Sequence, residues 1–212
     1  MGTRVVTLSH ATGAGGHTIG RTVAERLGFR YIDEEIITLA AEKERVDAAT
    51  VADAERRRGF LDRLFDSIAA ATQGDVHMVG SGILMSEAGQ APGSDYLRRL
   101  IVEAIHETAE RGQAVIVSHA ASIPLAGRAD VLRAFVTASV DTRVARIAAE
   151  QRADAPSPAT FIRDNDIARA DYFQRFYKIE RELPTHYDLV INTDSLNADE
   201  ASDIIVAAAR RR

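Results

Sequence analysis

Short apolar runs alternate with segments of helical periodicity in the first and last parts of the chain. The runs have the length of strands and lie at residues 5–8, 29–32, 114–118, 132–138 and 188–192. The run at 114–118 is apolar without alternation, as expected for a strand that is buried on both faces. The sequence therefore predicts an α/β domain with a parallel sheet of about five strands and helices on both faces.

The segment 4–33 has the pattern strand, glycine-rich loop, helix, strand. Ile19, Val23 and Leu27 recur every four residues, which predicts a helix with one face on the sheet. A glycine loop directly before a helix presents backbone N–H groups and the positive end of the helix dipole to an anion. We therefore predict that a nucleotide or another phosphorylated ligand binds at this loop. The predicted binding residues are Gly13, Ala14, Gly15, Gly16, His17 and Thr18.

One known phosphate loop, the Walker A pattern GxxxxGK[ST], matches this segment only in part. When the pattern is placed so that the helix starts correctly, it covers residues 10–17. His10, Gly16 and His17 then replace its leading glycine, its lysine and its hydroxyl residue. The positive charge that the lysine supplies to the phosphates is missing from the loop.

The dinucleotide pattern GxGxxG is a second partial match. It begins correctly at Gly13, but Thr18 stands in place of its last glycine. Asp33 lies about 20 residues further on, where a ribose-binding acid would lie in a Rossmann fold. These residues keep a Rossmann-type NAD-binding oxidoreductase open as an alternative.

Residues 5–33 resemble the cytidylate kinase-like branch of the nucleoside monophosphate kinases. Members of this branch have a GSGG-type loop without the lysine, a helix that ends in AEKLG, and an aromatic strand that ends in Asp. The matching stretches here are Gly13–Gly16, Ala24–Gly28 and Tyr31–Asp33. The resemblance extends to the C-terminal third, with a poorly matched middle, and implies a three-layer P-loop kinase fold with a helical lid.

The resemblance also implies one domain in three parts. The core comprises residues 1–33, 96–150 and 187–212, a substrate-binding helical insert covers about 34–95, and the lid covers about 151–186. The implied function is ATP-dependent phosphoryl transfer to a nucleoside monophosphate such as CMP, or to a related small acceptor, with Mg²⁺ carried mainly by the nucleotide. A non-catalytic nucleotide-binding protein with a degenerate P-loop is the alternative.

Arginines are the candidates to replace the missing lysine, because a guanidinium group can make two bonds to a phosphate. We expect catalytic roles for Arg163 and Arg169, in a helix that resembles the lids of this family, with Arg146 behind them. His17, in the first helical turn, is a further candidate for a hydrogen bond to phosphate. An exposed lid helix with salt bridges within itself, and an exposed His17, are the alternative interpretations.

Four residues are candidates for binding the acceptor. Asp166 and Tyr172 lie three residues to either side of Arg169, so all three share one helical face. Asp33 could contact substrate or cap the next helix. Arg57 belongs to a run of three arginines that could bind a monophosphate or form a solvated helix face.

Three histidines could replace the missing cation. The carboxyl ends of parallel strands meet at one edge of a sheet, so His10, His17 and His119 could converge there. Their scattered spacing does not predict a metal site.

Three residues are predicted to cap the starts of helices. Asp141 is the predicted N-cap of the helix that carries Arg143 and Arg146. Asn197 and Glu200 form a predicted capping pair for the last helix.

Composition narrows the class of partner. The net charge of −5 argues against a nucleic-acid binder, and a small-molecule nucleotide is the expected partner. The absence of cysteine excludes disulfides and thiolate sites. No apolar run has membrane-spanning length, so we expect a cytoplasmic protein that does not bind membranes, while the oligomeric state, a homodimer included, stays open.

Overall fold

The computed structural model of the chain describes residues 2–33, 36, 94–117, 120–150 and 157–211. The strands are β1 (Val5–His10), β2 (Arg30–Ile32), β3 (Ala114–Val117), β4 (Val131–Thr137) and β5 (Leu189–Asn192). The helices are α1 (Gly16–Leu27), α5 (Ser94–Arg111), α6 (Val140–Glu150), α7 (Pro158–Tyr177), the 3₁₀ helix η1 (Pro184–His186) and α8 (Ala198–Arg211). The five predicted strands are confirmed. Nearly all of the predicted insert lies outside the described residues.

The five strands form one parallel sheet in the order β2-β3-β1-β4-β5. In β1, Val5 lies opposite Ala114 of β3 and Val131 of β4. In the Rossmann order, the second strand would lie beside the first. Here β3 separates them, so the Rossmann alternative is wrong and Asp33 follows an edge strand.

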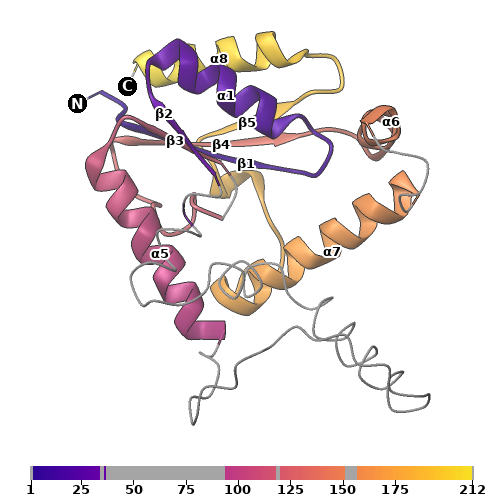
Figure 1. Cartoon of the computed structure of the whole chain (residues 1–212), viewed down its shortest axis with the longest axis horizontal. Helices are drawn as coiled ribbons and strands as arrows, with labels where there is room; N and C mark the ends of the chain where they lie inside the picture. The colour runs from indigo at the N-terminus through magenta and orange to yellow at the C-terminus, as the bar shows by residue number, and fades with distance from the viewer. Residues whose placement is uncertain (1, 34–35, 37–93, 118–119, 151–156, 212) are drawn as a thin grey trace, which may run out of the picture.

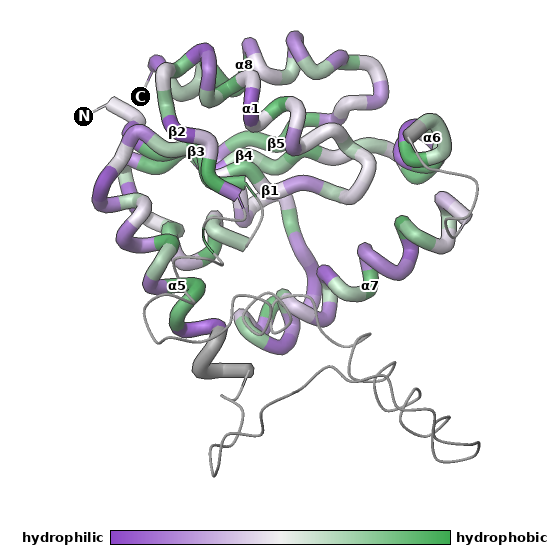
Figure 2. The backbone as a smooth tube through the Cα atoms, in the orientation of Figure 1, coloured by the Kyte–Doolittle hydropathy of each residue, from purple (hydrophilic) through white to green (hydrophobic). Residues whose placement is uncertain are grey.

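Helices cover both faces of the sheet, as the sequence predicted (Figure 1). Helices α1 and α8 lie on one face and pack on sheet residues such as Val6 and Leu8. Helix α5 packs on the other face, against Val5 and Ile116 among others. Figure 2 shows apolar positions along the central strands, as expected for parallel strands that are buried on both faces.

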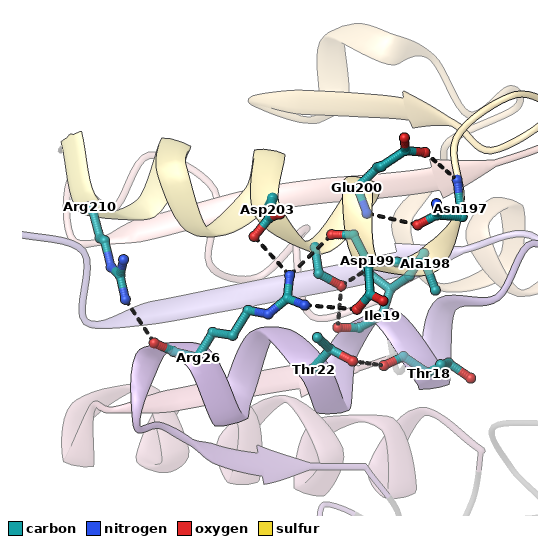
Figure 3. Close-up of polar contacts among 11 residues, drawn as sticks. Thr18, Ile19, Thr22, Arg26, Asn197, Ala198, Asp199, Glu200, Asp203 and Arg210 are labelled. Carbon is teal, nitrogen blue, oxygen red and sulfur yellow. Dashed lines mark hydrogen bonds and ion pairs between the residues drawn. The ribbon is translucent and has the colours of Figure 1, made fainter.

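Hydrogen bonds and ion pairs join α8 to α1 along their length (Figure 3). Arg26 of α1 pairs with Asp199 at 2.7 Å and with Asp203 at 2.8 Å, and Arg210 donates to the carbonyl of Arg26. These carboxylates are exposed, so each pair stabilises the fold by less than about 1 kcal/mol. The buried apolar seam between the two helices supplies most of the attachment.

The helix caps test the predictions about helix starts. Asn197 and Glu200 form the predicted capping pair, with each side chain accepting from the other's backbone N–H. The prediction for α6 is wrong by two residues, because the Ser139 hydroxyl accepts from the Thr142 N–H and Asp141 lies inside the first turn. Both residue types can cap, and only the position of the first helical turn distinguishes them.

Candidate functional site

The loop between β1 and α1 takes its shape from two glycines. Gly13 and Gly15 have φ angles of 80° and 85°, in the left-handed region that strongly favours glycine. A Cβ atom on Gly13 would also lie 3.0 Å from the carbonyl oxygen of Arg143, so α6 packs directly against the loop. The loop therefore depends on glycine both for its backbone angles and for its packing.

The N-terminus of α1 is electrostatically uncompensated within the part of the chain that the structure describes. Its N-cap, Gly15, makes no side-chain hydrogen bond, and the first turn contains no acidic residue. The N–H groups of Ala11 and Ala14 bond to backbone carbonyls, and that of Ile19 bonds to Gly15. Because the N–H groups between Gly15 and Thr18 precede the first intrahelical bond, they are available to an anion. Binding of a phosphate at these residues stays a prediction.

His10 fills the space where the missing lysine would begin. A Cβ atom on Gly16 would lie 2.2 Å from the Cγ atom of His10, which no real side chain could tolerate. Gly16 occupies the Walker A lysine position, and His10 occupies the position of its leading glycine. A bulky ring at position 10 therefore requires glycine at position 16, so the two departures from the Walker A pattern depend on each other.

His10 does not replace the lysine's charge. Burial, followed by the charge of neighbouring His17, lowers the pKa of His10 from 6.5 to about 4. Its ring is therefore neutral at pH 7, and its Nδ1 lies 3.3 Å from the carbonyl of Ala11. The positive charge for phosphate chemistry has to come from another residue.

His17 lies at the centre of a polar group at the start of α1. Its Nδ1 is 3.1 Å from the Tyr31 hydroxyl and 3.1 Å from Oδ2 of Asp33, and the Tyr31 hydroxyl donates to Asp33. Burial and the nearby Asp33 charge raise the pKa of Tyr31 to about 12, so the phenol stays protonated. The His17 side chain is 53% exposed, and this leaves room for a ligand beside it.

Arg146 holds the segment after β5 against the phosphate loop. Its two terminal nitrogens donate to the hydroxyl and carbonyl of Thr193, at 2.9 and 2.6 Å. The Thr193 hydroxyl lies 3.1 Å from the carbonyl of Ala14 in the loop. The structure thus places Arg146 near the loop, with its guanidinium group engaged by protein oxygens.

A cavity of about 260 Å³ separates α7 from the core beside the phosphate loop. Asp166 and Arg169, which the sequence placed on one helical face, both line it. Asp166 binds Arg143 of α6 through two parallel hydrogen bonds of 3.0 and 2.9 Å. The sequence predicted Arg143 on the same helix as Arg146 but indicated no role for it.

Arg169 is also held by a carboxylate. It donates to both oxygens of Glu182 at 2.8 and 2.7 Å, and Glu182 accepts from the Tyr187 hydroxyl. Burial opposes the charge on Arg169, but the bonds and charge of Glu182 outweigh it and raise the pKa of Arg169. The ring of Phe173 lies 4.9 Å from the guanidinium. No local pattern in the sequence indicated Glu182 or Tyr187.

The other predicted residues fall into three places. Arg163 is 66% exposed, pairs with neighbouring Asp164, and lines a second cavity together with Val140 of α6. Tyr172 is buried in an aromatic cluster, with its ring 4.9 Å from that of Phe176. Arg57 and His119 lie outside the described residues.

In the portion of the chain that the structure describes, no three His, Asp or Glu side chains gather as metal ligands. None of the helices in that portion combines the length and apolar character that crossing a bilayer requires.

Comparison with known sequences identifies the group of proteins that share these features. A sequence model of the cytidylate kinase-like family matches residues 5–195. The chain is also similar to a cytidylate kinase of Archaeoglobus fulgidus, with 26% identity over 96% of this chain and 93% of the relative.

Solved structures with the same fold include two that align over nearly the whole chain. An uncharacterized protein from Eubacterium ventriosum has a TM-score of 0.64 at 17% identity, over 98% of this chain and 99% of that one. A shikimate kinase from Bacteroides thetaiotaomicron has a TM-score of 0.51 at 16% identity, over 96% and 97% of the two chains. At such identity these similarities establish the kinase fold alone.

Proposed function

The chain belongs to the cytidylate kinase-like family, and on this premise we propose that it transfers the terminal phosphoryl group of ATP to a nucleoside monophosphate or a related small acceptor. The observation that carries the proposal is the uncapped start of α1 behind Gly13 and Gly15, whose N–H groups suit a polyphosphate. The name of the similar Archaeoglobus fulgidus protein suggests CMP as the acceptor.

The loop residues fit ATP better than they fit a metal ion. The backbone N–H groups of Gly13 and of residues 15–18 would hold the phosphates, and the segment at Thr193 would lie beside the base. Mg²⁺ would be carried mainly by the nucleotide, because His17 stands where a loop hydroxyl would bind it. When bound, the ion neutralises part of the phosphate charge.

The lid arginines supply the remaining positive charge in this proposal. In the reaction, an oxygen of the acceptor's phosphate bonds to the terminal phosphorus of ATP while the bond to the ADP oxygen breaks. The protein's task is to align both groups and to stabilise charge on the moving phosphoryl group. Arg169 and Arg163 are the proposed groups for this, with Arg146 and His17 beside the donor phosphates and Asp33 and Arg57 on the acceptor side. Asp166 is bound by Arg143 and Tyr172 is buried among aromatic rings, so neither is assigned to the acceptor.

The present positions of these arginines favour a second candidate function, a nucleotide-binding protein without turnover. Arg169 and Arg146 are both engaged by protein oxygens, and His10 is neutral. Catalysis therefore requires that the phosphoryl group displaces Glu182 from Arg169. A protein in which Glu182 keeps Arg169 would bind ATP without transferring its phosphate.

A coupled ADP-release assay separates the two functions. The purified protein is given ATP, Mg²⁺ and each common nucleoside monophosphate, and ATP binding is measured separately by calorimetry. We expect ADP formation with at least one pyrimidine monophosphate. ATP binding without ADP release across the panel would establish the binding protein instead, and absence of both would reject nucleotide function.

Arg169→Ala tests the catalytic assignment. We expect kcat to fall by about 10³-fold with nearly unchanged ATP affinity, because an arginine on the moving phosphoryl group acts mainly in the transition state. Arg133→Ala is the matched control, since Arg133 is another partly buried arginine paired with a carboxylate, Asp188, away from the loop. Equal kcat values for the two variants would remove Arg169 from the site.

A further inference from the structure

We propose that Arg143 is a positioning residue that couples the lid helix α7 to the phosphate loop, with Asp166 as its lid partner. This inference rests on the proposed function only for its consequence, nucleotide affinity. The coupling itself is a property of the protein without ligand. It assigns Asp166 to the loop through Arg143, in place of the acceptor contact that the sequence suggested.

The side chain of Arg143 links three parts of the chain: its own helix α6, the lid helix α7 and the loop before α1. It belongs to α6, its side chain is only 7% exposed, and both its terminal nitrogens bond to Asp166 of α7. One of these nitrogens also donates to the carbonyl of Thr12 in the phosphate loop, at 3.3 Å. A planar fork can satisfy both acceptors at once, whereas a lysine ammonium cannot reproduce this arrangement.

The bond to Thr12 fixes the direction of a phosphate-binding amide. In a trans peptide the C=O and the following N–H point in opposite directions. Because the Thr12 carbonyl points to Arg143, the N–H of Gly13 points the opposite way. Gly13 lies in the left-handed region and has no Cβ atom to restrict its backbone angles, and the Arg143 bond holds the preceding peptide in place.

Asp166 in turn determines where the Arg143 guanidinium lies. Without its carboxylate, the long side chain gains rotamers that no longer reach Thr12. Lid position and loop geometry are therefore linked, and the linkage is reciprocal: docking of α7 favours the binding-competent loop, and a nucleotide on the loop favours docking of α7.

The test is Asp166→Asn, compared with Asp188→Asn as a matched control. Asp188 also pairs with a partly buried arginine, Arg133, but between β4 and the segment before β5. In nucleotide-free protein, ¹⁵N order parameters of Thr12 and Gly13 should fall from about 0.85 to below about 0.6 in Asp166→Asn only. ATP affinity, measured by calorimetry with Mg²⁺, should fall about tenfold in the same variant.

Two conservative variants test the coupling if Asp166→Asn fails to fold. Asp166→Glu should restore most of the loop order, whereas Arg143→Lys, which keeps the charge and loses the fork, should not. Unchanged order parameters in Asp166→Asn or Arg143→Lys would overturn the coupling, as would equal loosening in Asp188→Asn. Wild-type protein that binds no nucleotide would reject the proposed function, yet the ligand-free order parameters would still decide the coupling.

Discussion

The phosphate loop and the lid helix α7 are held in place by different forces. At the loop, uncharged groups meet at close range: the His10 ring lies over Gly16, and the backbone of α6 lies against Gly13. On α7, two of the residues that line the cavity are charged, and both Asp166 and Arg169 make bidentate ion pairs. The loop is shaped mainly by close packing, with one guanidinium bond at Thr12, whereas α7 adds two ion pairs to the apolar packing of its aromatic side chains.

This difference shows how the two regions can divide the work of phosphoryl transfer. Backbone N–H groups set by tight packing give a fixed cradle that needs no rearrangement when phosphate arrives. Ion pairs can exchange partners, so a phosphoryl group can take the place of Glu182 at Arg169. Under the proposed function, the positive charge that the loop lacks would therefore come from the exchangeable region.

Restoring the lysine with Gly16→Lys is expected to produce the largest loss of stability. The new side chain would begin 2.2 Å from the His10 ring, so the free energy of unfolding should fall by about 3 kcal/mol. Denaturant unfolding measures the change. The double variant His10→Gly with Gly16→Lys removes the clash and should recover most of the loss. A stable single variant would show that the loop is less tightly packed than the lid.

Acid should destabilise the loop region before the lid. The folded-state pKa of His10 is about 4, below its ordinary 6.5, so the unfolded chain binds the proton first and stability falls as pH drops from 6.5 to 4. The loss should be about 2 kcal/mol at pH 5. The hydrogen bonds and charge of Arg169 outweigh the effect of burial and lower the pKa of Glu182. The Arg169–Glu182 pair therefore loses its contribution to stability only below about pH 4.5, the ordinary pKa of a glutamate.

The comparison of wild type with His10→Asn isolates this effect. Asparagine cannot titrate, so the variant should lose less stability between pH 6.5 and pH 5 in urea unfolding. Parallel curves for the two proteins would mean that His10 takes up its proton without disturbing the loop.

The smallest effect is expected at the ends of the two helices. Lys178 ends α7 with a φ of 57°, whereas the corresponding cap of α1 is Gly28 with a φ of 67°. Lys178→Gly should raise the free energy of unfolding by about 0.5–1 kcal/mol, because glycine adopts this conformation without strain. Gly28→Lys, where a side chain meets open space, should lower it by a similar amount. Thermal unfolding of both variants checks the pair.

Much of the fold followed from local patterns in the sequence. Apolar runs located the five strands, Gly28 marked the end of α1, and the Asn197–Glu200 pair marked the start of α8. Such signals are reliable because each depends on residues within one or two turns of each other. The cap of α6 was predicted wrongly because Ser139 and Asp141 can both cap a helix, and the local sequence does not distinguish them.

The sequence alone also located the phosphate loop and the helix that carries Arg163 and Arg169, because glycine geometry and helical spacing are short-range properties. Only the tertiary structure decided which groups meet: His10 over Gly16, Arg143 between Asp166 and Thr12, and Glu182 on Arg169. Partners of a charged side chain are chosen by the packing of whole elements, which brings together residues far apart in the sequence, such as Thr12 and Arg143, 131 positions apart. No spacing rule within a helix or loop encodes that choice.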